Sequence, residues 1–436
     1  MPQGARIYNL FPLLVGDVKA WEGHLDHIAG MGFDWIFLNP IHAPGVSGSL
    51  YSVKDYYALH PLFEDGSGDE PDVMIGRFLK AAEARGIRVM MDLVVNHTAI
   101  DSLLAEEHPE WFKHEADGSL ASPYAVDPTD TSKRTVWGDL AEIDYSSRPE
   151  RRALVEWFAE LVRHSVRLGF RGFRCDAAYK VPKDVWRLLI AAGRKENDDV
   201  LFIAENLGSL QEETLALRGA GFDYLFNSVK WWDFRAYWLI DQYEQFRSIA
   251  PSIAFPETHD TDRLINELAA EGVTDPKEIE KRYRSAYLIA ALFSTGVMIP
   301  IGFEYGFRKK LHVVETRPSD WEKPAFDLTE WIAEVNRVKG SLPVLNEEGP
   351  QRALLLGDQR VACLLRRAMR GPAWVVTLIN LDRNAPSTAR IEWLDGDVLV
   401  GREVTPGRAA DDPERPFRAG EEVTLEPGEV RVYANQ

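Results

Sequence analysis

The sequence has only two cysteines, Cys175 and Cys363, and they lie far apart in the chain. Because no cysteines stand at the short spacing of a zinc or iron–sulfur site, a cysteine-ligated metal centre is excluded. No run of about 18 apolar residues is present, which argues against a membrane-spanning helix. No charged segment followed by an apolar one opens the chain, so a cytoplasmic location is expected.

Positive charge is also scarce. Lys and Arg number 50 against 68 Asp and Glu, which gives a formal charge of −18. Such an excess of negative charge disfavours nucleic acid and anionic membranes as partners. A neutral substrate such as a sugar is compatible with it, whereas the oligomeric state is not predicted by these features.

Short apolar runs alternate with helical patterns over the first 340 residues or so. The expected strands are 6–11, 33–39, 88–95, 170–176, 200–205, 222–226, 253–257 and 297–301. Alternating strands and helices predict a parallel sheet with right-handed crossovers. Eight such units in this length predict a closed (β/α)₈ TIM barrel.

The helical patterns between these runs cover 18–31, 72–85, 149–168, 185–194 and 212–219. A final helix is predicted up to about Lys339. Asp327 would be its N-cap residue and Glu330 its N3 partner, which is the pairing of a capping box.

Two parts of the chain depart from the alternation. Polar sequence between His97 and Tyr145 interrupts the third repeat, and strand-like runs replace helical patterns after Pro343. Those late runs predict a C-terminal antiparallel β-sandwich, and they are 353–356, 361–365, 374–378, 423–425 and 430–433. The predicted domains are a catalytic barrel (1–96 and 146–345), a short inserted subdomain after the third strand (97–145) and the sandwich (350–436).

Polar residues gather at the expected C-terminal ends of the barrel strands, where active sites of such barrels lie. They are Asp92, Asn96 and His97 after strand three, Arg174 and Asp176 at strand four, Glu205 at strand five, and Thr258, His259 and Asp260 after strand seven. Together they predict an acidic active site on one rim of the barrel.

Two of these carboxyl groups stand in different surroundings. Arg174 and Asp176 share a strand face, so the arginine is expected to keep Asp176 ionised as a nucleophile; a structural ion pair is the alternative. Glu205 follows three apolar residues, and desolvation is expected to raise its pKa, as a general acid requires. This pair is typical of glycoside hydrolysis, with Asp260 expected to stabilise positive charge developing on the sugar. A zinc site is excluded because His97 and His259 lack the HExxH spacing.

Four ordered segments carry a resemblance to a known family. MDLVVNH (91–97), GFRGFRCDAA (169–178), FIAEN (202–206) and ETHD (257–260) resemble the signature segments of the α-amylase superfamily, glycoside hydrolase family 13. Further similar segments are GSLYSVKDYY (48–57), WGDLAEIDY (137–145) and GVMIPIGFEYG (296–306). The resemblance therefore extends over essentially the whole chain.

This resemblance implies a retaining α-amylase-type hydrolase or transglycosylase that acts on α-1,4-linked glucan or maltooligosaccharides. Asp176 would be the nucleophile, Glu205 the acid/base and Asp260 the transition-state stabiliser. Tyr51 would stack on the sugar, while His97, Arg174 and His259 would contact the sugar or the nucleophile. Whether water or a sugar hydroxyl receives the glycosyl group is left open.

The sequence departs from the family pattern after the nucleophile. Tyr179 and Lys180 stand where family amylases carry Lys-His, and Thr258 replaces a more usual Asn. We therefore expect no required cofactor and no metal ligands, with Ca²⁺ at Asn96 as the alternative to a structural role for that residue.

Two alternatives concern the function. PIHAPG (40–45) and HPEWFKHEADG (108–118) are similar to segments of maltosyltransferases that use maltosyl phosphate to extend α-1,4-glucan. The other alternative is a non-catalytic amylase-like scaffold, which the presence of all three carboxylates disfavours.

Aromatic residues leave a further choice open. Trp231 and Trp232 follow strand six. Their rings could either stack on a glucose ring or pack in the core, and the sequence leaves both alternatives open. Trp111 and Phe112 are expected to form a small core of the insertion itself.

Overall fold

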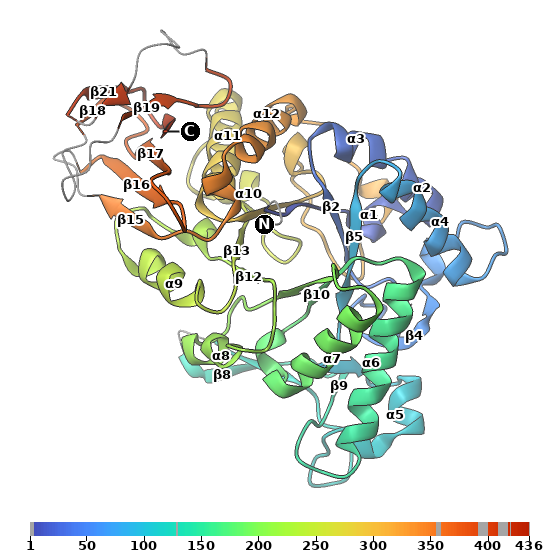
Figure 1. The fold of residues 1–436 in the computed structure, drawn as a ribbon. Helices are drawn as coiled ribbons and strands as arrows, with labels where there is room; N and C mark the ends of the chain where they lie inside the picture. The colour runs from blue at the N-terminus through green and yellow to red at the C-terminus, as the bar shows by residue number, and fades with distance from the viewer. Residues whose placement is uncertain are drawn as a thin grey trace.

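The computed structural model describes residues 4–127, 130–354, 359–390, 400–408, 417–418 and 420–435. Its centre is a closed parallel barrel with strand order β1-β14-β13-β12-β11-β10-β5-β2 (Figure 1). The strands are β1 (Arg6–Asn9), β2 (Trp35–Leu38), β5 (Arg88–Leu93), β10 (Gly172–Cys175), β11 (Leu201–Ala204), β12 (Tyr224–Phe226), β13 (Ser252–Ala254) and β14 (Gly296–Pro300). The (β/α)₈ prediction is confirmed, since each expected strand overlaps one of these.

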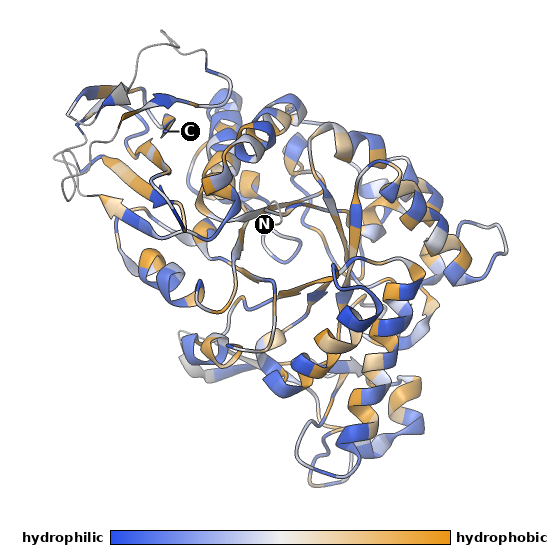
Figure 2. Cartoon of the chain, viewed as in Figure 1, coloured by the Kyte–Doolittle hydropathy of each residue, from blue (hydrophilic) through white to orange (hydrophobic). Residues whose placement is uncertain are grey.

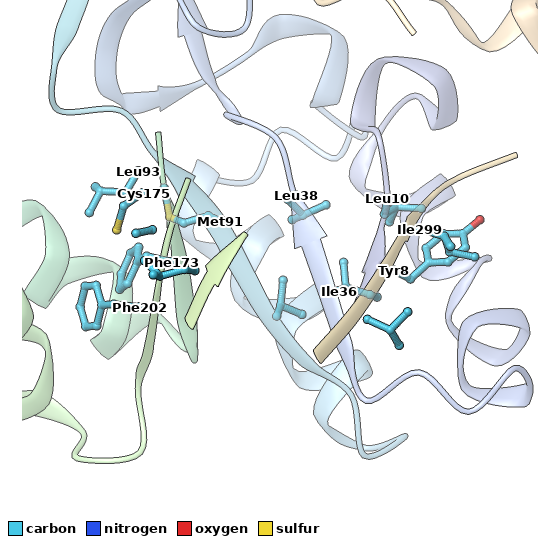
Figure 3. Packing of buried hydrophobic residues seen from close by; sticks show 14 of the residues in the cluster. Tyr8, Leu10, Ile36, Leu38, Met91, Leu93, Phe173, Cys175, Phe202 and Ile299 are labelled. Atoms are coloured by element: carbon cyan, nitrogen blue, oxygen red, sulfur yellow. The ribbon is translucent and has the colours of Figure 1, made fainter. Parts of the chain in front are cut away.

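Alternation of side chains along the strands divides the core into two layers. Inward-facing residues such as Phe37, Met90 and Ile203 fill the barrel. Outward-facing residues pack against the surrounding helices, and Figure 3 shows Phe173 beside Phe202 in that layer, with ring centroids 5.1 Å apart. The same two-residue period decides which polar side chains reach the barrel interior.

The helices surround the barrel and carry both polar and apolar residues, as Figure 2 shows for α6 and α7. They are α1 (Pro12–Val15), α2 (Val18–Glu22), α3 (Leu25–Gly30), α4 (Pro71–Glu83), α6 (Arg151–Leu168), α7 (Lys183–Glu196), α8 (Gln211–Ala216), α9 (Trp238–Phe246), α10 (Leu264–Ala270), α11 (Pro276–Phe293) and α12 (Thr329–Ser341). None of the described helices combines the length and apolar character that crossing a membrane requires.

Two helix predictions need correction. The helix expected over 18–31 is two helices, because Gly23, a poor helix former, ends α2 and α3 starts at Leu25. Helix α12 begins at Thr329 after Leu328 as N-cap. Asp327 lies one residue too early for that role, and its carboxylate instead accepts a hydrogen bond from the Thr329 backbone N–H at 2.9 Å.

The segment after β5 forms a small structure of its own at the barrel rim. It contains β6 (His97–Ala99) paired antiparallel with β9 (Leu140–Glu142), helix α5 (Leu103–Glu107), and a hairpin of β7 (Tyr124–Asp127) and β8 (Asp130–Val136). A separate pair, β3 (His42–Pro44) and β4 (Val53–Leu59), follows β2. Trp111 and Phe112 are buried in the cluster shared with the barrel helices, so the expected separate core of the insertion is wrong.

The C-terminal segment is antiparallel, as predicted, and lies beside α9 and α11 in Figure 1. A six-stranded sheet and a two-stranded sheet, β18-β21, form it. The strands are β15 (Gln351–Leu354), β16 (Val361–Arg367), β17 (Trp374–Asn380), β18 (Ser387–Arg390), β19 (Val400–Glu403), β20 (Phe417–Arg418), β21 (Glu422–Leu425) and β22 (Val430–Ala434). Residues 355–356 of the first predicted run lie outside the described residues.

Candidate active site

The barrel strands bring the predicted carboxylates to one rim. On β5 and β10, Asp92 and Arg174 are register partners. The next residue pair continues the parallel pairing, since the Asp176 N–H donates to the Leu93 carbonyl at 3.2 Å. Glu205 follows β11 directly, and its N–H donates to the Cys175 carbonyl at 3.1 Å. The C-terminal ends of three neighbouring strands therefore present these side chains together.

Arg174 stands at the centre of the cluster, and its side chain is only 3% exposed. Its Nη1 lies 2.6 Å from Asp176 Oδ1 and 2.9 Å from Asp92 Oδ2. Its Nη2 lies 3.9 Å from both Glu205 Oε2 and Asp260 Oδ2. One guanidinium thus balances several carboxylates, which would otherwise repel one another in a desolvated site.

Glu205 has the environment expected of a proton donor. Burial raises the pKa of its carboxyl to about 7, with Arg174 opposing that rise and Asp176 adding to it. Backbone N–H groups of Ala177 and Leu207 donate to its two oxygens at 3.0 and 2.6 Å. Ala177 has a φ of 43°, an unusual left-handed conformation for alanine that turns its N–H towards Glu205.

Tyr51 connects the carboxylate cluster to Asn39 and His259 on the same rim. Its hydroxyl donates to Asp92 Oδ2 at 2.7 Å and accepts from Asn39 Nδ2 at 3.0 Å. His259 Nε2 lies 2.8 Å from the same hydroxyl, and the two rings stack with an interplanar angle of 4°. Burial lowers the pKa of His259, so its ring is neutral at neutral pH. These contacts fix the Tyr51 ring beside the carboxylates.

His97 faces the cavity with one nitrogen to spare. Its Nδ1 lies 3.4 Å from Asn96 Nδ2, while its buried Nε2 has no hydrogen-bond partner among the described residues. Burial lowers its pKa, so a neutral tautomer with Nε2–H is consistent with the amide donating to Nδ1. That N–H is available to a hydroxyl in the cavity.

A cavity of about 880 Å³ opens over the cluster. Asp176, Glu205, Asp260, Tyr51, His97 and Arg174 all line it, whereas His259 reaches the site through Tyr51 and Asp260. The volume suits a ligand larger than a single small metabolite. All seven residues predicted as catalytic or substrate-binding therefore lie in one place.

The inserted segment supplies a cavity wall that the sequence did not predict. Tyr124, Trp137 and Leu140 line the cavity, and the first two expose 40% and 43% of their surface. On the other side Trp231 lines it and is 50% exposed, while Trp232 is buried and packs against Phe293. The structure thus leaves the Trp231 ring open to a ligand in the cavity, whereas the Trp232 ring packs in the core.

Two supporting residues were given no role by the sequence. Asp92, whose side chain has no solvent exposure, accepts hydrogen bonds from both Arg174 and Tyr51. Asn39 positions the Tyr51 hydroxyl. A signal for Asp92 was present, because it shares strand parity with the inward-facing Met90.

No group of three or more His, Cys, Asp or Glu side chains among the described residues is arranged to hold a metal ion. Asn96, the alternative calcium ligand, contacts His97. Tyr179 and Lys180 line the cavity, and Lys180 Nζ lies 3.8 Å from Glu213. Because Tyr179 and Lys180 stand where family amylases carry Lys-His, no strict calcium requirement is expected.

Removing calcium should therefore leave the protein's thermal stability unchanged. A ligand that binds only the folded state raises stability by mass action, so its loss would lower the melting temperature. We expect the midpoints of melting curves with EGTA and with excess Ca²⁺ to coincide within about 1 °C. Loss of several kcal/mol of calcium binding would exceed that, since the shift is ~2–4 °C per kcal/mol for roughly 150–250 residues and somewhat smaller for a longer chain. A large fall with EGTA that calcium reverses would contradict this.

Comparison with known proteins finds similar sequences and similar structures. Residues 3–127 match the family described as glycogen debranching enzyme, glucanotransferase domain. An α-1,4-glucan:maltose-1-phosphate maltosyltransferase of Burkholderia pseudomallei is 29% identical over 81% of this chain and 30% of its own length. One of Myxococcus xanthus is 26% identical over 86% of this chain and 58% of its own. The chain thus spans less than two thirds of these relatives.

Solved structures show the same fold. An α-amylase from Lactobacillus plantarum superposes with a TM-score of 0.74 at 20% identity, covering 99% of both chains. An α-amylase from Geobacillus thermoleovorans, complexed with acarbose, gives 0.74 at 19% identity. These findings confirm the resemblance to the α-amylase superfamily and, within it, to the maltosyltransferases.

Proposed function

We propose that this protein, which resembles the α-amylase superfamily, is a retaining glycoside hydrolase or glucanotransferase of family 13. It would act on α-1,4-linked glucan or maltooligosaccharides through a covalent glycosyl ester. The observation that carries the proposal is the gathering of Asp176, Glu205 and Asp260 around one guanidinium at the floor of a large cavity. We further propose that residues 97–145 form a subdomain that closes one side of the cleft.

The first half of the reaction forms the ester. Asp176 attacks the anomeric carbon while Glu205, protonated because burial raises its pKa to about 7, gives its proton to the departing glycosidic oxygen. The C–O bond to the leaving sugar breaks as the bond to the Asp176 oxygen forms. Asp260, whose side chain is 57% exposed, faces the sugar and stabilises its positive charge.

The second half reverses these roles. Glu205, now a carboxylate, takes a proton from water or from a sugar hydroxyl as that oxygen attacks the anomeric carbon. The ester bond to the Asp176 oxygen breaks in the same step, which restores the Asp176 carboxylate. Two inversions give overall retention. Such a mechanism requires the carboxyl groups of Asp176 and Glu205 to lie about 5–5.5 Å apart, and we predict that separation here.

The neighbouring side chains hold the reacting groups in place. Arg174 balances the charge of Asp176, and Tyr51 presents its ring to the sugar. His97 donates from Nε2 to a sugar hydroxyl, and His259 fixes both Tyr51 and Asp260. The two cysteines are free and buried. We propose a cytoplasmic location, where such thiols stay reduced.

A second candidate is a maltosyltransferase that takes its donor as maltosyl phosphate. The names of the relatives from Burkholderia pseudomallei and Myxococcus xanthus favour it. The chemistry at Asp176 and Glu205 is the same in both candidates, because only the leaving group differs. The scaffold alternative is disfavoured by the complete set of carboxylates in the cleft.

Product analysis separates hydrolysis from transfer. The protein is incubated with maltotetraose and the products are separated by chain length. Shorter products alone indicate hydrolysis, and chains longer than the substrate indicate transfer. Absence of any product from neutral glucans and from maltosyl phosphate would contradict the proposal.

Replacing Trp231 with alanine should weaken substrate binding more than catalysis. Its exposed ring lines the cavity and carries no group that takes part in proton transfer, so we expect KM for maltotetraose to rise roughly 5- to 30-fold, the loss of about 1–2 kcal/mol of stacking and apolar contact. The expected kcat changes little. Steady-state kinetics measure both constants.

Trp238→Ala is the matched control. Trp238 is 41% exposed at the start of α9 and does not line the cavity. Equal effects of the two substitutions on KM would argue against stacking at Trp231.

A further inference from the structure

The charge of the cavity wall is strongly unbalanced. Carboxyl groups outnumber cations by six to three among the described lining residues, and carboxylates outnumber cations by five to three when Glu205 holds its proton. The acidic residues are Asp139, Glu142, Asp176, Glu205, Glu213 and Asp260, and the cations are Lys113, Arg174 and Lys180. His97 adds no charge, because burial lowers its pKa.

Each of the three cations already has an acidic neighbour. Arg174 contacts Asp92 and Asp176. Lys113 Nζ lies 2.6 Å from Glu142 Oε1. Lys180 Nζ lies 3.8 Å from Glu213 Oε1, a looser pair. An anion entering this cavity would therefore compete with carboxylates for every lining cation.

Lys180 is the lining lysine that lies nearest in the chain to Asp176. It ends a short helical turn, Ala178–Lys180, that follows Asp176. The Ala178 N–H donates to the Glu205 carbonyl at 3.0 Å, which ties this turn to the strand end that carries the proton donor. Lys180 and Glu213 therefore line the cavity next to the strand end that carries the proton donor.

We propose that this cleft selects an uncharged glycosyl donor over a sugar phosphate, and that Glu213 enforces the choice by occupying Lys180. The inference rests on the proposed function and narrows its substrate class. A phosphate ester carries about −1.5 to −2 charges at neutral pH, so it meets repulsion from the carboxylates. A neutral glucan meets none and gains hydrogen bonds from the same groups.

The donor inferred for this chain differs from the donor that the names of its relatives specify. Their names specify maltose 1-phosphate as donor. Sequence identities of 29% and 26% do not require a shared leaving group, because function depends on the side chains of the site rather than on overall similarity.

Turnover is the first test. Purified protein receives maltotetraose or maltosyl phosphate at equal concentration, and initial rates are followed by product separation and by phosphate release. We expect kcat/KM for maltosyl phosphate to be lower by at least about 100-fold, with a rise as salt screens the repulsion. A preference for maltosyl phosphate would overturn the inference while leaving the carboxylate mechanism intact.

Binding is the second test, and it does not depend on activity. Calorimetry compares maltose with maltosyl phosphate on the wild-type protein. Weaker binding of the phosphate, strengthened by salt, supports the inference even if no substrate is turned over, in which case only the proposed function fails. Tighter binding of the phosphate overturns it.

The substitution Glu213→Gln tests whether Glu213 sets the preference for an uncharged donor. Freeing Lys180 from a carboxylate should strengthen maltosyl phosphate binding by roughly tenfold relative to maltose, the effect of one charge near a protein surface. Glu212→Gln, on the same helix and not lining the cavity, is the matched control and should change the ratio less than about twofold. Equal ratios in the two variants would contradict the assignment to Glu213.

Discussion

Replacing Asp176 with alanine should abolish turnover of α-glucans and leave the fold intact. The substitution removes the atom that forms the ester, and loss of a nucleophile should exceed the ~10²–10⁴-fold typical of general acid–base help. The fold should tolerate it because the Asp176 side chain lies at the rim and is 13% exposed. Arg174 keeps Asp92 as its partner. Steady-state kinetics and a melting curve together measure both expectations.

Asp184→Ala provides the control for Asp176→Ala. Asp184 is a surface residue at the start of α7, 57% exposed and paired with Arg151, so near-normal activity is expected. Retention of near-normal activity by Asp176→Ala itself would show that the role assigned to this carboxylate is wrong.

Replacing Glu205 with glutamine should lower kcat by about 10²–10⁴-fold and change the pH profile. The wild-type carboxyl must be protonated to act, and burial raises its pKa to about 7. Activity should therefore be present below that pH and be lost as pH rises through it. An amide does not titrate, so the residual activity of the variant should lack this alkaline limb.

The glutamine variant also has a structural consequence that needs a check. Both oxygens of Glu205 accept backbone N–H groups, from Ala177 and Leu207, and an amide nitrogen cannot accept either bond. A loss of about 1–3 kcal/mol is expected from one unsatisfied donor. A melting curve separates this from the catalytic loss. An alkaline limb near pH 7 that persists in the variant would assign the titration to another group.

The barrel could be predicted from sequence because its signals are local. Each strand is a short apolar run, and polar residues at the run's C-terminal end must reach the same rim once the sheet closes. Arg174 and Asp176 lie two residues apart, so strand periodicity alone places them together. Glu205 follows its apolar run directly, and this position predicts desolvated surroundings for its carboxyl group.

The missed features depend on contacts between distant segments. The Tyr51 hydroxyl meets Asp92 across 41 residues and His259 across 208 residues of sequence. Neighbours in sequence can also take opposite roles. Trp231 faces the cavity and Trp232 packs on Phe293, because the short turn they share points their side chains to different sides.

The hairpin of β7 and β8 shows the same limit. Its sequence is polar and lacks a clear period, so the sequence indicated only an insertion. Its packing against the rim makes Tyr124 and Trp137 part of the cavity wall. These two side chains reach the cavity because the segment that carries them lies between β6 and β9, which pair with each other. Such placement depends on tertiary structure and not on local sequence.

Trapping the glycosyl ester tests the central claim most directly. In Glu205→Gln, α-maltosyl fluoride can still form the ester because fluoride leaves without a proton, whereas breakdown lacks its base, so the intermediate should accumulate. Rapid acid quench, proteolysis and mass spectrometry then locate the added group. The account predicts one maltosyl unit on the peptide that contains Asp176. A maltosyl unit on a different residue, or fluoride release with an inverted free sugar and no adduct, would contradict it.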